Sequence, residues 1–292
     1  MKNRWLMFIA LYFSAFSISV NQFKVAPIMN NLAEYYHVSI TSVAFLMSVF
    51  TITGIIVAIP SAKIVEKLGP QKLGVIIMAL LTAGSLVGGF APNFTVLMTS
   101  RVIEGVGFAL IFLVGMVLVS TWFKPEEMAI PTGIFITFST GAIILVFAFA
   151  GQLVVKYGWH SLWYVGTVLG IISLLLFLFI IRVPKMEMEG PAARSEPVSF
   201  KEGFLNGKVL LVAIIMGSTA FLVFSLTSLY AVIFTNYYHL DPLAANSLVS
   251  ASGVFALISC ILSGVVIAKT NKPNLVLLIS SIRDAGHLCF HI

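Results

Sequence analysis

Three ionisable residues interrupt long apolar stretches of this sequence: Lys24, Arg101 and Glu104. A charge inside a membrane is costly, so such residues usually face a partner or a water-filled pathway. Arg101 and Glu104 stand three positions apart and therefore share one face of a helix. Two interpretations stay open for this pair. Either the two charges neutralise each other, or Arg101 faces a cavity and Glu104, in a low-dielectric site that favours its neutral form, exchanges a proton.

Lys24 lies near the end of the first apolar stretch and follows the polar residues Asn21 and Gln22. A lysine in this position can extend its ammonium group to the membrane surface. Alternatively, it shares a basic site with Arg101 that suits an anion. We therefore take Lys24, Arg101, Asn21 and Gln22 as candidate substrate-binding residues and Glu104 as the candidate proton-coupling residue.

The composition places these residues in a membrane protein. Of 292 residues, 59% are hydrophobic and 10% are charged, and the mean hydropathy is +1.05. A soluble domain of this size needs more charge on its surface, so the predicted partner is a lipid bilayer. The sequence has no nucleotide-binding loop, metal-ligand cluster or nucleophile triad. We expect no enzyme activity, no cofactor, no metal and no nucleic-acid binding.

The apolar runs predict membrane helices, because about 20 such residues span a bilayer core. The predicted fold class is an all-α membrane protein, and a ninth span is expected after Pro273. The eight preceding spans are predicted at Trp5–Met29, Ile40–Ala62, Lys72–Phe90, Phe94–Trp122, Met128–Val155, Ser161–Ile181, Lys208–Thr235 and Leu243–Ala268.

Lysine and arginine indicate the orientation. With the N-terminus inside the cell, 13 of the 17 basic residues fall in cytoplasmic segments. The excess of positive charge on cytoplasmic loops predicts this topology in the cytoplasmic (plasma) membrane.

A short internal repeat predicts two related halves. The residues Tyr35-Tyr36-His37 return 202 positions later as Tyr237-Tyr238-His239, after the first and the seventh apolar runs. Duplicated bundles of six helices are typical of transporters. We predict an N-terminal six-helix bundle at 1–182, a cytoplasmic linker at 183–207, and an incomplete second bundle of about three helices at 208–292.

The loop between the second and third spans, 62–72, resembles the cytoplasmic signature of the major facilitator superfamily, Gly-x-Leu-x-Asp-Arg-x-Gly-Arg-Arg. Glu66 stands at the aspartate, Lys67 at the arginine and Gly69 at the second glycine. Ala62 replaces the first glycine, and the basic pair after Gly69 is missing.

Two further motifs are similar to those of the superfamily. The stretch 101–107 resembles Arg-x-x-Gln-Gly-x-Gly, with Glu104 at the glutamine, and 158–164 resembles the Gly-Trp-Arg-x-x-Phe turn. The stretch 21–27 is loosely similar to the first span of cyanate- and organic-anion-type members.

The resemblance implies a facilitator fold and alternating access, in which two bundles rock around a central substrate site. It implies that Ala62, Glu66, Lys67 and Gly69 form a cytoplasmic gate loop. In the family the loop acid interacts with an eleventh span, which this sequence lacks.

We therefore expect a secondary active transporter, a symporter that moves a small solute, an anion, coupled to protons. We also expect the chain to be C-terminally truncated. The alternative is a non-functional remnant or a membrane partner subunit without transport activity; a membrane enzyme ranks third.

Overall fold

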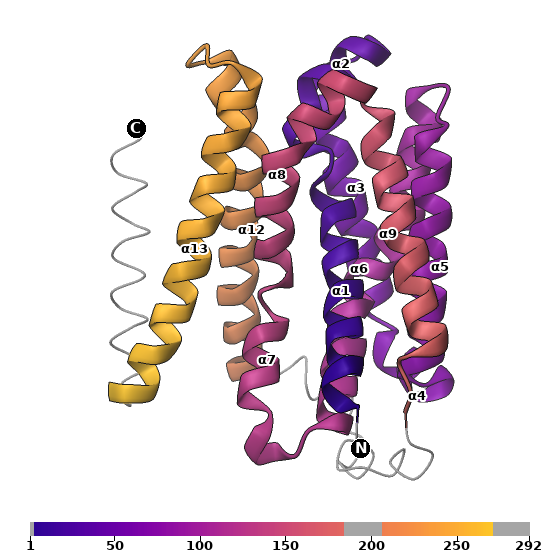
Figure 1. Cartoon of the computed structure of the whole chain (residues 1–292), viewed down its shortest axis with the longest axis vertical. Coiled ribbons are helices and arrows are strands. Elements are labelled where there is room, and N and C mark those ends of the chain that lie inside the picture. The colour runs from indigo at the N-terminus through magenta and orange to yellow at the C-terminus, as the bar shows by residue number, and fades with distance from the viewer. Residues whose placement is uncertain (1–2, 184–205, 271–292) are drawn as a thin grey trace.

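The computed structural model describes residues 3–183 and 206–270, and the elements in this part of the chain are helices, without a strand (Figure 1). This confirms the predicted all-α membrane fold. The predicted ninth span and nearly all of the predicted linker lie outside the described residues.

Seven described stretches are long and apolar enough to cross a membrane. They include the six spans predicted for the first half and the span predicted from Leu243. The elements of the first half are α1 (Arg4–Phe23), η1 (Ala26–Ile28), α2 (Met29–Tyr36), α3 (Ile40–Ala58), α4 (Ser61–Leu68), α5 (Pro70–Gly89), α6 (Phe94–Trp122), η2 (Pro125–Glu127), α7 (Ala129–Phe135), α8 (Phe138–Tyr157) and α9 (His160–Phe179). The second half contains α12 (Gly207–Asn236) and α13 (Pro242–Thr270).

The first span differs from the prediction. Instead of one helix that ends at Met29, α1 stops at Phe23, a 3-10 turn follows, and α2 continues to Tyr36. Pro27 lies in that turn. A proline has no N–H for the helical ladder and its ring collides with the preceding turn, so it breaks a helix.

Two more predicted spans are divided. The second ends at Ala58 instead of Ala62, and Pro60 precedes the separate short helix α4. The fifth is split into α7 and α8 around Thr137, whose hydroxyl donates to the Ile134 carbonyl 2.7 Å away. Only the fourth predicted span, Phe94–Trp122, coincides with its helix at both ends.

The two repeated corners have the same local geometry. His37 and His239 both adopt φ +54°, and they are the only non-glycine residues with positive φ in the described chain. After each corner a side chain caps the next helix. Ser39 accepts a bond from the Ser42 amide at 3.1 Å, and Asp241 accepts one from the Leu243 amide at 3.0 Å.

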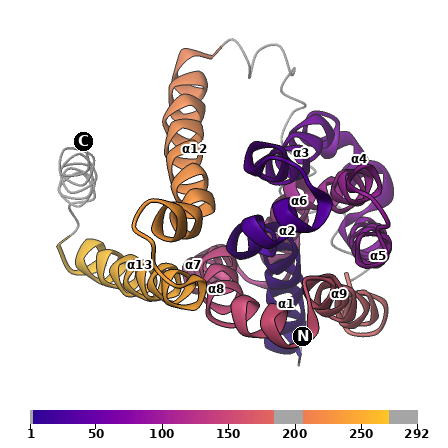
Figure 2. The same ribbon diagram turned by 90° about the horizontal axis from the view of Figure 1, so that it is seen from above.

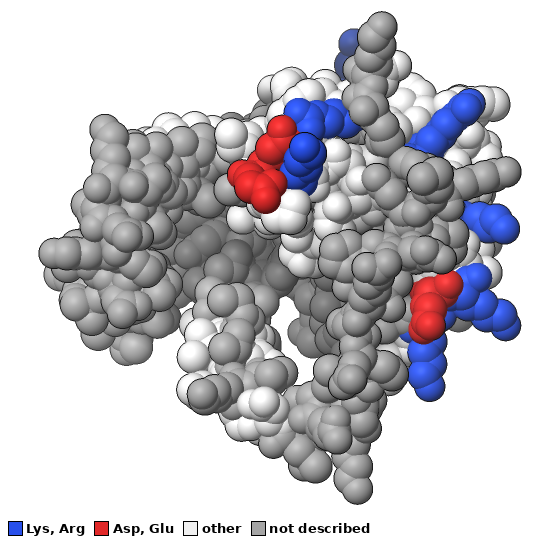
Figure 3. All heavy atoms as spheres, turned by 90° about the horizontal axis from the view of Figure 1, so that it is seen from below, with Lys and Arg blue, Asp and Glu red and all other residues white. Residues whose placement is uncertain are grey.

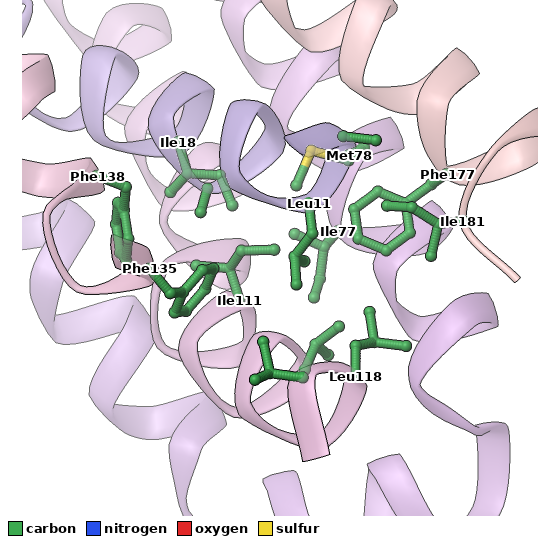
Figure 4. Close-up of a cluster of buried hydrophobic side chains, with 14 of the residues drawn as sticks. Leu11, Ile18, Ile77, Met78, Ile111, Leu118, Phe135, Phe138, Phe177 and Ile181 are labelled. Atoms are coloured by element: carbon green, nitrogen blue, oxygen red, sulfur yellow. The ribbon is translucent and has the colours of Figure 1, made fainter. Parts of the chain in front are cut away.

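Apolar side chains from α1, α5, α6 and α9 form a buried cluster in the first bundle (Figure 4). Leu11 and Ile18 of α1 meet Ile77 of α5 and Ile111 of α6 there, all of them fully buried. Glycine permits a close contact between helix backbones: a Cβ on Gly105 of α6 would lie 2.3 Å from the Phe50 carbonyl of α3.

Helices α12 and α13 pack beside α8 and η1 (Figure 2). Two of their polar contacts with the first half lie toward the end that carries α2. The Asn30 amide donates to the Asn236 side chain at 3.1 Å, and Asn246 donates to the Pro27 carbonyl at 3.3 Å. The second half therefore meets the first beside the break in the first span.

Candidate functional site

The structure brings Lys24, Glu104 and Arg101 into direct contact. Lys24 Nζ lies 2.6 Å from Glu104 Oε1, and Arg101 Nη1 lies 2.5 Å from Glu104 Oε2. The exposed fraction of each side chain is 1% or less. One carboxylate therefore bridges two cations inside the first bundle, and we call these three residues the charge cluster.

Local structure places each member. Arg101 and Glu104 stand one turn apart on α6, so their side chains leave the helix on the same side. Lys24 is the residue that caps the C-terminal end of α1. The break before Pro27 therefore positions the lysine level with the charged turn of α6.

The ammonium group of Lys24 has a full set of acceptors. Besides Glu104, it donates to Asn21 Oδ1 at 2.8 Å and to Ser85 Oγ at 2.9 Å. The indole ring of Trp163 lies 4.6 Å from Nζ, within range of a cation–π contact. An ammonium group has three N–H donors, and all three are occupied.

Arg101 holds the end of α1 through the backbone. Its guanidinium donates to the carbonyls of Asn21 at 2.7 Å and Gln22 at 3.0 Å, and Nε donates to the Leu46 carbonyl at 3.4 Å. The last carbonyls of a helix lack intrahelical partners. Arg101 supplies the donors that the broken first span requires, and its guanidinium also lies over the Phe50 ring at 4.4 Å.

Asn21 joins the cluster to α9. Its side-chain amide donates to the carbonyls of Ser17 at 3.0 Å and Gly166 at 3.4 Å, while its Oδ1 also accepts from Ser85 at 3.1 Å. A Cβ on Gly166 would lie 2.2 Å from Asn21 Oδ1, so α9 can approach this closely only with glycine there.

Gln22 contacts the charge cluster through its backbone. Its carbonyl binds Arg101, but its side-chain Oε1 is buried and has no hydrogen-bond partner within the described residues. Ser85 and Trp163 were not among the predicted site residues. A signal for Ser85 existed, since it is a hydroxyl between glycines in an apolar helix, 84–89.

The burial of Lys24 excludes one interpretation. A lysine that extends to the membrane surface would expose its ammonium group, whereas Lys24 is 1% exposed. The surface-reaching interpretation is therefore wrong. Arg101 and Glu104 form an ion pair, as one of the two interpretations left open for them requires.

The charge balance of the cluster is uneven. Two basic side chains face one carboxyl group, all of them fully buried, so the cluster has one more basic group than acidic groups. Buried ions are tolerated when they are paired and hydrogen-bonded. Chemically, the cluster can attract a further negative charge, or it can change its charge by gaining or losing a proton.

The predicted gate loop lies at the end of the molecule that carries the N-terminus (Figure 1). Its residues form α4, and Gly69, at φ +75°, turns the chain into α5. Glu66 and Lys67 are exposed and form no ion pair within the described part of the chain. Figure 3 shows lysine and arginine side chains spread over this end.

The ion pair between Arg4 and Glu127 lies at the same end. Arg4 donates to Glu127 of η2 at 2.5 and 3.1 Å. The hydrogen bond from Arg4 lowers the pKa of the Glu127 carboxyl below its usual value. This exposed pair ties the start of α1 to the connection between α6 and α7.

Comparison with known proteins defines the class. Residues 9–284 match the sequence profile of the Major Facilitator Superfamily. The chain belongs to this superfamily of membrane transporters and is a multi-pass membrane protein, not an enzyme. The predicted family is thereby confirmed.

The individual relatives share less than a third of the aligned residues with this chain. The uncharacterized MFS-type transporter YfhI of Bacillus subtilis is 29% identical over 180 residues, which cover 60% of this chain and 44% of YfhI. The uridine/deoxyuridine transporter of Lactococcus lactis is 22% identical over 174 residues, which cover 59% of this chain and 36% of that protein. The chain thus spans less than half the length of these curated relatives.

Solved structures confirm the fold. The crystal structure of a D-xylose-proton symporter superposes with a TM-score of 0.68 at 12% identity, covering 90% of this chain and 68% of the symporter. At this identity the likeness concerns the fold alone.

Proposed function

We propose that this chain serves secondary active transport of a small anion, coupled to protons, with the charge cluster of Lys24, Glu104 and Arg101 as its ion-responsive element. The observation that supports the proposal is that two basic side chains share one carboxyl group inside the first bundle, all three fully buried. Ionisable side chains inside a membrane are costly, and those that occur there usually belong to a functional site.

The broken first span supports an ion-linked role. Transporters form ion and substrate sites where a membrane helix is interrupted and its backbone groups become available. Here the interruption lies beside Lys24, and the freed carbonyls of Asn21 and Gln22 bind Arg101. A change in the charge of the cluster would act directly on the joint between α1 and α2.

Glu104 is the proposed proton-coupling residue because it makes both ion pairs. A proton on this carboxylate would weaken the bonds to Lys24 and Arg101 together. Both cations would then lack a counter-ion, and an entering anion could replace it. Lys24 uses all three of its donors in this structure, so direct binding of an anion requires that this arrangement opens first.

Orientation and gating complete the proposal. The end that carries α4 faces the cytoplasm of a plasma-membrane protein, and Ala62, Glu66, Lys67 and Gly69 act in a gate at that side. Cysteine at Lys67 should then react with a membrane-impermeant maleimide only from the cytoplasm, and cysteine at Lys156 only from outside. Reaction of both from one side would contradict this orientation.

A proteoliposome assay tests the transport. Vesicles that contain the purified chain and an internal pH dye receive an inward gradient of nitrate, sulfate or a short alkyl sulfonate. The expected result is a pH change that depends on both the anion and the protein. Xylose and uridine, which are uncharged, should cause none.

Variants separate the coupling from stability. Glu104→Gln should abolish the anion-dependent pH change, Arg101→Ala should abolish anion uptake, and Lys24→Arg should retain part of it. Glu126→Gln, an exposed carboxylate on η2, is the matched control and should behave as the parent. Equal proton flux in a folded Glu104→Gln protein would leave the cluster a purely structural role. Absence of flux with every anion would contradict the proposal.

A further inference from the structure

We infer that a small cavity between the two halves binds one ordered water molecule, which bridges the interrupted first span to α12 and α13. The inference rests on the size of the cavity, on burial and on hydrogen bonding, so it does not depend on the proposed transport. We call this cavity the joint cavity.

The joint cavity lies where the first span is interrupted. Pro27 of η1 and Met29 and Asn30 of α2 line it from the first half, and Thr235 of α12 and Asn246 of α13 line it from the second half. Its volume is about 20 Å³. A cavity of roughly 10–15 Å³ already holds one water molecule. The space therefore fits a single water and is too small for a transported solute.

Asn246 carries an acceptor that requires a partner. Its amide nitrogen donates to the Pro27 carbonyl at 3.3 Å, whereas its Oδ1 is buried and accepts a bond from no residue in the described part of the chain. An amide oxygen has two lone pairs, and a buried acceptor that stays unpaired destabilises the fold. An O–H group of a water molecule supplies the missing donor.

The neighbours of this amide determine which of its two ends remains for the water. The nitrogen lies beside Gly151 of α8, where an added Cβ would be 3.3 Å from Asn246 Nδ2. A reversed amide would set Oδ1 against the Pro27 carbonyl oxygen, and two acceptors form no hydrogen bond. The nitrogen is therefore held by η1, and the oxygen remains for the water.

Further partners for the water lie on α12 and α2. The Thr235 hydroxyl donates to the Ala231 carbonyl at 2.8 Å, so its oxygen can still accept a bond. The Asn30 side chain donates to Asn236 at 3.1 Å, and its own oxygen can also accept. A buried water typically makes about three hydrogen bonds, and the polar groups of this cavity can supply that number.

The water extends the contact between the two halves. The direct bond from Asn246 reaches η1 alone, whereas a water on its Oδ1 can reach α2 and α12 as well. A bond through an ordered water is nearly as favourable as a direct one. The same short turn is held from the first half by Arg101, through the carbonyls of Asn21 and Gln22. The interrupted span is therefore fixed by polar groups from both halves.

Pulsed X-ray radiolysis of the full chain in liposomes tests the site, because hydroxyl radicals that form from a bound water oxidise the side chains beside it. Met29 lines the cavity and is 1% exposed. Met78, which is 0% exposed in the apolar cluster of Figure 4, is the matched control. Met29 should be oxidised several-fold faster than Met78. A radical scavenger in the buffer should suppress oxidation of the exposed Tyr237 and leave that of Met29 unchanged.

Two variants identify the groups that hold the water. Asn246→Leu should lower the oxidation rate of Met29 to that of Met78. Thr235→Val keeps the shape of the side chain and removes its hydroxyl, so it should lower the rate in part, and it decides the test if Asn246→Leu does not fold. Ser247→Ala, at the exposed neighbouring position of α13, should behave as the parent chain.

Four results would overturn the inference. Equal rates for Met29 and Met78 in the parent chain would mean that no water is bound. An unchanged rate in both variants would mean that these groups do not hold it. Suppression of Met29 oxidation by the scavenger would identify bulk solvent as the source of the radicals. Loss of Met29 oxidation when sodium is replaced by N-methylglucamine would identify a hydrated cation as the ligand.

Discussion

The first span and the seventh are counterparts in the repeat, yet they have different shapes. Both lead into a corner with a histidine at φ +54°. The first span breaks at Lys24 and contains Pro27, whereas α12 runs unbroken from Gly207 to Asn236. The corresponding residues in α12 are Leu226 and Leu229.

The difference shows that the helix turns of the repeat are independent of its charged residues. The corners and caps set how consecutive helices turn, and both halves keep them. The break, the lysine and the partners on α6 belong to the first half alone among the described residues. This asymmetry is a reason to place the proposed site in the first half.

The largest expected effect concerns Glu104. It pairs with Lys24 of the first span, whereas the corresponding residue of α12, Leu226, carries no charge. Glu104→Gln leaves Lys24 and Arg101 buried without a counter-ion, which should destabilise the bundle by about 3–5 kcal/mol. Lys24→Leu, which imports the α12 residue, leaves the Arg101–Glu104 pair intact and should be near neutral. Thermal unfolding in detergent measures both. A larger loss for Lys24→Leu would show that the lysine, not the carboxylate, organises the cluster.

Exchanging the proline tests the shapes directly. Leu229→Pro should cost about 3 kcal/mol, because it removes a backbone hydrogen bond inside α12. Pro27→Leu should cost less, since Arg101 already occupies the freed carbonyls. Straightening the first span should nevertheless shift α2.

Disulfide formation reports that shift. Cysteines at Asn30 and Asn236, whose side chains are 3.1 Å apart, should cross-link readily in the parent chain and poorly with Pro27→Leu. An unchanged yield would mean that the break does not position α2.

Close packing around the broken span gives the next effect. Gly166→Ala forces a Cβ toward Asn21 Oδ1, and overpacking of this kind should cost about 1–3 kcal/mol. Gly133→Ala in α7 is the matched control, because nothing lies within 4 Å of the added Cβ. That change should be neutral or slightly stabilising. Equal melting temperatures for the two variants would contradict the tight contact.

The smallest effect should be the same in both halves. Histidine is strained at positive φ and glycine is not, so His37→Gly and His239→Gly should each stabilise by about 0.5–1 kcal/mol. The two shifts in melting temperature should agree, since the φ values are equal. Opposite signs would mean that the corners are not equivalent.

The sequence predicted the helices well and their interruptions poorly. Long apolar runs identify a span because the bilayer sets its length, and Phe94–Trp122 was correct at both ends. Pro27 and Pro60 lay inside predicted spans, and hydropathy cannot tell a broken helix from a continuous one. Whether a proline bends or ends a helix depends on which neighbours satisfy the freed carbonyls.

The candidate site was predicted in part. Lys24, Arg101 and Glu104 stood out because charges are rare in apolar runs, and the structure brings them together. Which carbonyls Arg101 binds, and that Ser85 completes the lysine shell, follow from tertiary packing of α1, α5 and α6. Sequence spacing shows which residues share a face of one helix, but it does not give the distances between residues on different helices.

The enclosure of the Lys24 ammonium group by hydrogen-bond acceptors affects its chemical reactivity. Acylating reagents attack the lone pair of a neutral amine that they can reach, and Lys24 is enclosed by Glu104, Asn21 and Ser85. The lysines of the α4 end, such as Lys63 and Lys67, are exposed. Mild acetylation followed by mass spectrometry would therefore modify the α4 lysines first. The degree of modification at Lys24, relative to the α4 lysines, then measures opening of the first bundle.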